Sequence, residues 1–250
     1  MLLKKIAAKL LSPRRKIRRN RKLPRGVDVF KEIARFFPAL NIEVVFDVGA
    51  NVGQSTQIYL SRLPGSHIYC FEPVDDTFYK LQRNHKNNNR ITCCKLALGS
   101  SQGKRTMVLD RGSKEAFLID SSKNSDVDSY EIEESVDLTT LDDYCDVNGV
   151  ERINYLKIDT EGHDLEVLKG SVNMISERRI DLIEVEAGMN PSNLLHVPFE
   201  TLKDYLESCS YVVFGIYEQA WETRTGEAHL RRINAVFVSL EVIKMNKQSG

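Results

Sequence analysis

An apolar run that stops at a glycine-rich turn is the feature that most constrains the fold of this chain. Residues 43–48, EVVFDV, are mostly apolar and β-branched, which is typical of a strand buried on both faces of a parallel sheet. The next residues, GANVG, include Gly49 and Gly53, and glycine tolerates sharp backbone turns that other side chains hinder. We expect a helix to follow, up to about residue 63. The sequence therefore predicts a strand, a tight turn and a helix in direct succession.

The same alternation continues along the chain. Residues 67–72 predict a second strand, Asp75 can cap a helix that runs to about Asn87, and residues 91–94 predict a third strand. This order is typical of a parallel sheet with right-handed crossovers, in which helices cover both faces. The same periodicities predict further strands over 153–159 and 179–187, and helices over 164–168 and 199–209.

The end of the chain breaks this alternation. Residues 211–217 and 233–240 are apolar, strand-like runs, and no helical pattern separates them. We therefore expect an antiparallel pair that closes the sheet. The predicted fold class is α/β, with a mostly parallel sheet, an antiparallel final strand and helices on both faces.

The chain length fits one α/β domain, which we place at residues 27–245. Its first helix is expected after Asp28, a good capping residue, and before Pro38. One internal stretch, residues 104–140, has an irregular pattern, although 104–110 and 131–138 within it have strand character.

Positive charge is concentrated at the N-terminus. Residues 1–25 contain eleven Lys or Arg and no acid, so the rest of the chain has eleven more acidic than basic residues, although the formal net charge is zero. An acidic domain is a poor partner for a phosphate backbone, and we expect no nucleic acid partner. Apolar residues at helical spacing over 2–11 predict an amphipathic helix. We therefore treat residues 1–26 as a separate basic segment, able to lie on an anionic membrane surface.

Two further features bear on location. No apolar run is long enough to span a bilayer. The five cysteines are irregularly spaced and form no C-x-x-C pair, which argues against a disulfide framework or a zinc site. We expect a cytoplasmic protein, peripheral at the inner face of a membrane if the basic segment binds there.

The first turn has the residue types that an adenosine-containing cofactor needs. Gly53 allows a ligand to approach the helix N-terminus, where free N–H groups favour a carboxylate or a phosphate. Glu72 ends the next strand, 19 residues past Gly53, where an acid can bind both ribose hydroxyls. A nicotinamide cofactor favours G-x-G-x-x-G, whereas here Asn51 is central, and Asp47 can meet the ammonium group of a methionine moiety. A purely structural turn and an NAD-dependent oxidoreductase remain the alternatives.

Several segments together resemble the FkbM-type methyltransferase family. They cover roughly residues 43–187 in the expected order: FDVGANVGQS (46–55), FEPVDDTFYKLQRN (71–84), LALGS (96–100), LTTLDDYC (138–145) and YLKIDTEGHDLEVLKG (155–170). The resemblance implies a Rossmann-like methyltransferase sheet, S-adenosyl-L-methionine as cofactor and, usually, a hydroxyl oxygen of a saccharide or other small hydroxylated metabolite as methyl acceptor. By motif position it assigns the cofactor site to Asp47, Gly49, Asn51, Gly53, Ser55 and Glu72.

Methyl transfer to a hydroxyl needs alignment of donor and acceptor, exclusion of water and a base. Such groups belong at the carboxyl ends of parallel strands, where four candidates occur: Asp159, Glu161, His163 and Glu186. Each also has a structural interpretation, as a turn residue, a helix-start residue or an outward ion pair. The four could together bind a metal, but their spacing is not diagnostic, and we assign none.

Polar residues of the later loops are weaker candidates for contacts to the acceptor, against the alternative of a solvated loop. They are Asn190, His196, Trp221, Arg224, His229, Arg231 and Arg232. We expect His67 and His85 at the surface. The functional alternatives are an O-methyltransferase, an NAD-dependent oxidoreductase, and a non-catalytic adapter that positions the basic segment.

Overall fold

The computed structural model describes residues 26–109, 116–118, 132–193, 195–223 and 226–248. The amphipathic helix and the basic run expected at the N-terminus lie outside the described residues. Among the helices that are described, none has the length and apolar character needed to cross a membrane.

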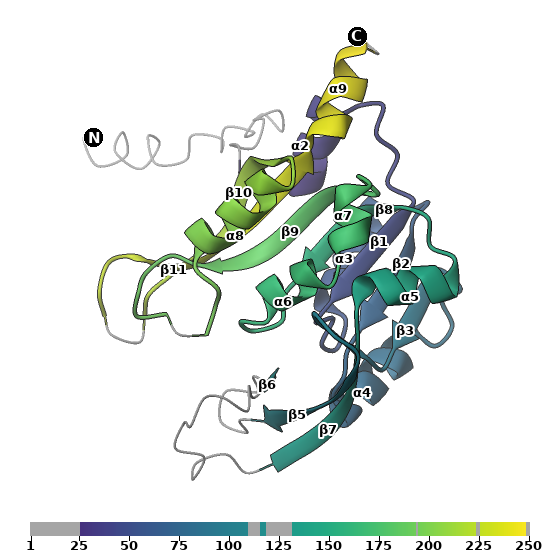
Figure 1. The fold of residues 1–250 in the computed structure, drawn as a ribbon, viewed down its shortest axis with the longest axis vertical. Coiled ribbons are helices and arrows are strands. Elements are labelled where there is room, and N and C mark those ends of the chain that lie inside the picture. Colours follow the sequence, from purple (N-terminus) through teal and green to yellow (C-terminus); the bar gives the residue numbers. More distant parts are fainter. Residues whose placement is uncertain (1–25, 110–115, 119–131, 194, 224–225, 249–250) are drawn as a thin grey trace, which may run out of the picture.

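A large sheet forms the centre of the described chain (Figure 1). Its strands lie side by side in the order β10-β11-β9-β8-β1-β2-β3. The strand bounds are β1 Val44–Val48, β2 His67–Phe71, β3 Ile91–Cys94, β8 Ile153–Ile158, β9 Ile180–Gly188, β10 Tyr211–Trp221 and β11 Leu230–Ser239. Neighbouring strands are parallel except at β11, which is antiparallel to both β9 and β10. The predicted α/β fold, with its antiparallel final strand, is confirmed.

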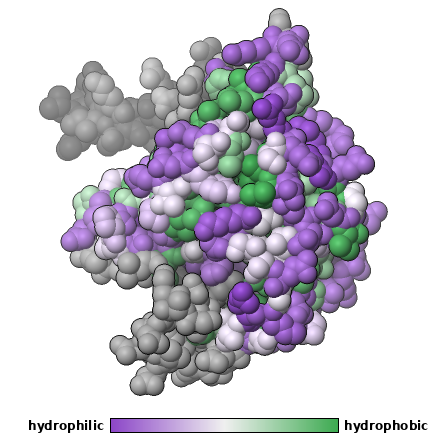
Figure 2. All heavy atoms as spheres, in the orientation of Figure 1, coloured by the Kyte–Doolittle hydropathy of each residue, from purple (hydrophilic) through white to green (hydrophobic). Residues whose placement is uncertain are grey.

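Helices cover both faces of this sheet. On one face lie α2 Val29–Phe36, α3 Gln54–Arg62, α4 Asp75–His85 and α9 Leu240–Gln248, and on the other α5 Leu141–Asn148, α6 Asp164–Lys169, α7 Val172–Ser176 and α8 Phe199–Ser208. Successive strand residues point to opposite faces, so Val45 packs under the first group and Phe46 under the second. The face of the molecule seen in Figure 2 is largely hydrophilic, with scattered apolar side chains. The two apolar cores therefore lie between the sheet and its helices.

Helix starts follow the sequence in one case and depart from it in another. Asp28 caps α2, because its side chain accepts a hydrogen bond from the N–H of Lys31 at 3.2 Å. The prediction that Asp75 caps α4 is wrong by one position: Val74 is the cap and Asp75 is the first helical residue. The N–H of Asp75 donates instead to the carboxylate of Glu134, 2.8 Å away.

The irregular stretch forms a second, smaller sheet, at the bottom of Figure 1. It contains β4 Ala97–Leu98, β5 Gly103–Leu109, β6 Ala116–Leu118 and β7 Ile132–Thr139, in the order β4-β7-β5-β6. The strand character expected over 104–110 and 131–138 is confirmed. Apolar side chains of this sheet, among them Met107 and Val136, pack with Val74 at the start of α4. The small sheet therefore flanks the loop that follows β2.

Candidate active site

The predicted site residues gather at the carboxyl ends of four neighbouring parallel strands, β9, β8, β1 and β2. Val48 at the end of β1 pairs with Ile158 at the end of β8, and Ile158 pairs with Val185 in β9. The turn after β1, the turn after β8 and the loop after β9 therefore begin at one edge of the sheet. This edge is where open α/β sheets bind their ligands.

The two glycines of the first turn make room for protein atoms. Gly49 has φ +81°, and a Cβ there would lie 1.9 Å from the backbone oxygen of Asp159. Gly53 has φ +94°, and its Cβ would lie 2.4 Å from Nε2 of His85. The close packing of α4 therefore requires a glycine at position 53, and the approach of a ligand to this turn stays a prediction. The prediction of His85 as a surface residue is wrong, because it is buried beneath this turn.

Glu72 fastens the first turn to the loop after β2. One carboxylate oxygen accepts a hydrogen bond from the N–H of Asn51 and the other from the N–H of Val74, each at 3.0 Å. Burial raises the pKa of Glu72 to about 7, and these two hydrogen bonds act in the opposite direction. Each oxygen keeps a further lone pair, so the carboxylate can also accept hydrogen bonds from two ribose hydroxyls.

Asp47 is the penultimate residue of β1 and is fully buried. Its Oδ2 accepts a hydrogen bond from the Thr56 hydroxyl at 2.9 Å, whereas its Oδ1 has no hydrogen-bond partner among the described residues. Burial raises the pKa of Asp47. A buried acceptor without a partner is costly, and the ammonium group of a methionine moiety would satisfy it. Ser55, in the first turn of α3, is hydrogen-bonded to Tyr59.

A buried lysine, Lys157, lies near both Asp47 of β1 and Asp159 of the turn after β8. The sequence analysis did not predict it as a site residue. Lys157 in β8 donates to Oδ2 of Asp159 at 2.7 Å. Burial alone would lower the pKa of Lys157, but Asp159, Asp47 and Glu184 together raise it. Glu184 in turn accepts hydrogen bonds from Tyr155 and from other buried groups. The sequence did contain a signal for this group of buried charged side chains, because Lys157 interrupts an otherwise mostly apolar strand.

Glu161, Glu186 and His196 form a compact cluster at the ends of β8 and β9. The Nε2 atom of His196 lies 2.7 Å from Oε2 of Glu186 and 3.7 Å from Oε2 of Glu161. His196 and Glu186 are buried, and the Glu161 side chain is about 29% exposed, so the cluster opens toward solvent on one side. Arg232 of β11 contacts the other oxygen of Glu186. Burial lowers the pKa of His196, against the opposing effect of Glu161.

Close backbone contacts hold this cluster together. Glu161 has a left-handed φ of +50°, which is unusual for a residue with a side chain. A Cβ on Gly162 would lie 2.3 Å from the carbonyl oxygen of Leu195, so only glycine allows the two loops to touch there. The N–H of Gly188 donates to the carbonyl of Val197 at 2.9 Å. The loop after β9 is therefore folded back onto the turn after β8.

The structure thus separates the four predicted catalytic residues. Glu161 and Glu186 come together, Asp159 is paired with Lys157, and His163 stands at the start of α6 outside the cluster. His196, a weaker candidate from the sequence, takes the place in the cluster that we expected for His163. Its position 35 residues past Glu161 gave no sign of this contact.

The remaining loop candidates have mixed outcomes. Asn190 donates to the carbonyl of Leu230 at 3.1 Å and so ties the loop after β9 to the start of β11. The loop and this end of β11 both extend past α6 (Figure 1). Trp221 ends β10 with an exposed side chain, and His229 is paired with Glu227. Arg231 and Arg232 begin β11 beside the cluster, whereas Arg224 lies outside the described residues.

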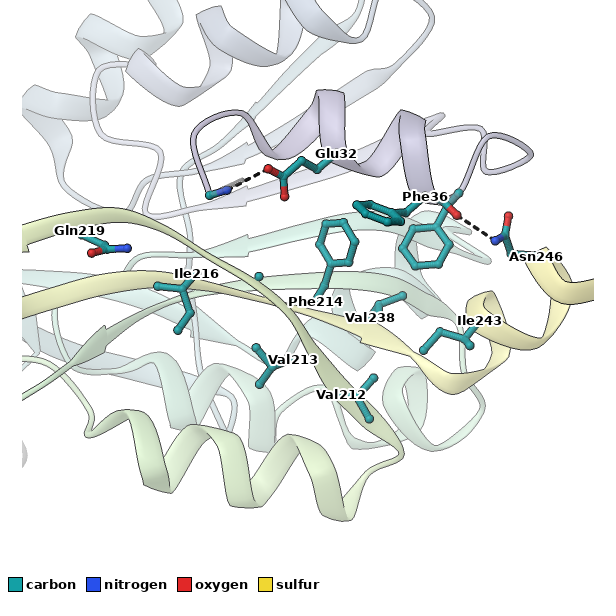
Figure 3. A pocket seen from close by; sticks show the side chains of 13 residues that line it. Glu32, Phe36, Val212, Val213, Phe214, Ile216, Gln219, Val238, Ile243 and Asn246 are labelled. Carbon is teal, nitrogen blue, oxygen red and sulfur yellow. Dashed lines mark hydrogen bonds between the residues drawn. The ribbon is translucent and has the colours of Figure 1, made fainter. Parts of the chain in front are cut away.

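A hollow of about 630 Å³ lies elsewhere, between α2, β10 and α9 (Figure 3). Its lining is largely apolar and includes Phe36, Phe214 and Ile243. Val238, near the end of β11 that is remote from Arg232, also lines it. The hollow is therefore separate from the carboxyl edge that carries the polar cluster.

The fold is an α/β sheet with the acidic residues Asp47 and Glu72 at its carboxyl edge, an arrangement that suits an adenosine-containing cofactor. The chain matches the family model of the methyltransferase FkbM domain over residues 47–213, and it belongs to this family. The matched part of the chain is therefore a methyltransferase domain of the S-adenosyl-L-methionine-dependent class, for which S-adenosyl-L-methionine is the cofactor. The buried, unpartnered oxygen of Asp47 and the ribose-type acceptor Glu72 fit this cofactor. The NAD-dependent alternative is therefore wrong.

Curated relatives are also methyltransferases by name. The chain is 28% identical over 155 residues to the hexuronic acid methyltransferase AglP of Haloferax volcanii, covering 61% of this chain and 59% of AglP. It is 23% identical over 146 residues to the 2-O-methyltransferase NoeI of Sinorhizobium fredii, covering 54% and 60%. The matched segments thus span about three fifths of the length of these two relatives.

Two solved structures that contain S-adenosylhomocysteine are also similar to this chain. The N-terminal domain of human METTL16 in complex with S-adenosylhomocysteine gives a TM-score of 0.46 at 13% identity, covering 84% of this chain and 68% of that one. M. capricolum TrmK in complex with S-adenosylhomocysteine gives a TM-score of 0.47 at 10% identity, covering 84% and 67%.

Proposed function

We propose that this chain transfers the methyl group of S-adenosyl-L-methionine to a hydroxyl group of a saccharide. The observation that carries the proposal is the cluster of Glu161, Glu186 and His196 at the strand ends beside the cofactor turn. The names of two relatives, a hexuronic acid methyltransferase and a 2-O-methyltransferase, support an acceptor of this kind.

The reaction places a defined demand on the cluster. The acceptor oxygen attacks the methyl carbon, the bond from carbon to sulfur breaks, and sulfur keeps the electron pair. The products are a methyl ether, S-adenosylhomocysteine and one proton, which a group of the enzyme must take. Two carboxylates and an imidazole within reach of one point can orient a hydroxyl and remove its proton. Buried walls on the side of Glu186 exclude water from that point.

A labelled-donor assay tests this proposal. Purified chain is incubated with methyl-labelled donor and with oligosaccharides that do or do not contain a hexuronic acid. We expect label in a saccharide ether, and turnover about 10²–10⁴-fold lower for Glu186→Gln at unchanged donor affinity, the scale for loss of acid–base assistance. Calorimetry that detects no donor binding, with no label in any acceptor, would instead favour the adapter.

We further propose that residues 1–25 bring the chain to an anionic membrane surface. Their eleven basic residues and apolar stripe support this, because each basic residue near such a surface adds about 1 kcal/mol of attraction. Full-length chain should sediment with anionic vesicles at low salt and stay in solution at high salt. A chain that starts at Val27 should not sediment, and equal sedimentation of the two would refute the proposal.

A further inference from the structure

Within the cluster of Glu161, Glu186 and His196, hydrogen-bond acceptors outnumber hydrogen-bond donors. One ligand-type atom from each side chain lies within 4.8 Å of the other two. The two carboxylate oxygens are acceptors when ionised, so the state of the imidazole nitrogen between them decides the chemistry. That state follows from the contacts on the opposite side of the ring.

Asn193 fixes which ring nitrogen of His196 carries a hydrogen. Oδ1 of Asn193 accepts from the backbone N–H groups of Leu195 and His196, at 3.2 and 3.3 Å. Its Nδ2 donates to the carbonyl of Arg231 at 2.9 Å. Backbone groups therefore determine the orientation of this amide. Nδ1 of His196 lies 2.9 Å from the same Oδ1, so Nδ1 must be the donor.

The other ring nitrogen then faces the carboxylates with a lone pair. In a neutral imidazole with Nδ1 protonated, Nε2 is an acceptor, and it lies 2.7 Å from the Glu186 oxygen. Two acceptors at this distance repel each other unless a proton or a metal ion lies between them. A protonated imidazole would give an ordinary ion pair with Glu186, whereas a metal ion would use all three side chains.

Three observations favour the metal ion. A histidine ligand typically donates its distant N–H to a fixed acceptor, as Nδ1 does to Asn193. Arg232 contacts the Glu186 oxygen that faces away from the imidazole, which leaves the other oxygen to the cluster. Glu161 is held in a strained left-handed conformation, and such strain persists where the surrounding structure fixes a functional group.

We propose that Glu161, Glu186 and His196 bind one divalent transition-metal ion. Two carboxylates and one imidazole suit Mn²⁺ and its neighbours in the first row, and the exposed side of Glu161 leaves coordination positions open. The role of the ion rests on the proposed function: it binds the acceptor hydroxyl and lowers its pKa, as a metal lowers the pKa of bound water. The hydroxyl proton then passes to solvent or to a carboxylate, and His196 acts as a ligand and not as the base.

Direct binding of Mn²⁺ to the full chain, after chelation and dialysis, tests the site without any assay of turnover. Electron paramagnetic resonance of free Mn²⁺ should show uptake of one ion per chain. Glu186→Gln and His196→Gln should each weaken binding by at least about tenfold, the lower end of the range for disturbing a metal site. The matched control is His229→Gln, which removes a histidine that also pairs with a glutamate, at 3.0 Å, but has no place in the cluster.

A second measurement covers variants that fail to fold. In wild-type chain, Mn²⁺ should broaden the nuclear magnetic resonance signals of residues 186–188 and 195–198 before those of β3, at the far edge of the sheet. Absence of binding at millimolar Mn²⁺ or Zn²⁺, or broadening that does not favour these residues, overturns the site. Full methyl transfer in the presence of chelator overturns the proposed role of the ion and leaves the proposed function intact. Metal binding without methyl transfer to any saccharide overturns the proposed function and leaves the metal site intact.

Discussion

The cofactor half and the acceptor half of the carboxyl edge are built in different ways. At the proposed cofactor half, Asp47 and Glu72 lie at the carboxyl ends of the neighbouring strands β1 and β2. Glu72 accepts from backbone N–H groups of the adjacent turns, and Asp47 accepts from the Thr56 hydroxyl in the first turn of α3. At the proposed acceptor half, the cluster consists of Glu161, Glu186 and His196, which the chain brings together through the turn after β8 and a long loop. One half is thus a local motif, and the other is assembled by topology.

This difference matters for how each half can be changed. The glycines of the first turn contact β8 and α4, so the cofactor half is locked into the packing of the sheet. The acceptor half depends on contacts between loops, such as Gly162 against Leu195. Loops tolerate variation better than packed strands do, so the fold can keep one cofactor site while its acceptor changes.

The largest expected effect is at Lys157, which lies between the halves. Replacing it in Lys157→Met removes the positive charge that compensates Asp159, Asp47 and Glu184. Removing one partner of a buried ion pair typically costs about 3–5 kcal/mol, because the remaining charges are left uncompensated. Urea denaturation should show a loss of this size in the free energy of unfolding.

Lys104→Met is the matched control for this variant. Lys104 also pairs with a carboxylate, that of Asp137 at 2.7 Å, but both side chains are well exposed. An exposed pair contributes about 1 kcal/mol or less. Similar losses in the free energy of unfolding for Lys157→Met and Lys104→Met would mean that the buried charge of Lys157 does not couple the two halves.

A smaller and more selective effect is expected at Glu72. Glu72→Gln places an amide nitrogen where one oxygen accepts a backbone N–H, and it removes the charge that would bind ribose hydroxyls. Donor affinity should fall by about 1–3 kcal/mol, or roughly 5- to 150-fold, while Mn²⁺ binding at the acceptor half stays the same. Calorimetric titration measures both. Glu43→Gln, at the opposite end of β1, is the control, and equal donor affinity in all three proteins would contradict the assignment.

The same contrast explains what the sequence could predict. Gly49 and Glu72 belong to a strand-turn-helix pattern with fixed spacing. β-α alternation predicted the parallel sheet, and the absence of a helical pattern between residues 211–217 and 233–240 predicted its antiparallel strand. His163 is close to Glu161 in sequence, so we favoured it. His196 reaches the cluster because Gly162 and Gly188 let the loop after β9 fold back, and that path has no sequence pattern. The same holds for the small sheet, whose strands were recognisable but whose pairing was not.

Dependence on pH offers the finest separation of the two halves, because each contains one carboxyl with a pKa raised to about 7 mainly by burial. These are Glu72 at the cofactor half and Asp164 at the acceptor half. Asp164 is the buried first residue of α6, and its carboxylate accepts a hydrogen bond from the hydroxyl of Thr160, next to Glu161, at 2.9 Å. A raised pKa means that the folded chain holds the proton more tightly than the unfolded chain does. Each group therefore contributes stability that is fully present below the unfolded pKa of about 4.5 or lower, and lost as the pH rises through about 7.

Donor binding should follow the opposite direction, with Glu72 as the donor-site carboxyl that titrates near pH 7. If the ribose hydroxyls donate to an ionised Glu72, donor affinity should rise as the pH increases through about 7. It should be about tenfold weaker at pH 6 than at pH 8, or about 1.4 kcal/mol. Asp164→Asn should flatten part of the pH dependence of stability and leave that of donor affinity unchanged, whereas Glu72→Gln should abolish the latter. Calorimetric titration across this pH range measures the affinities, and a steep dependence that persists in Glu72→Gln would place the controlling group elsewhere.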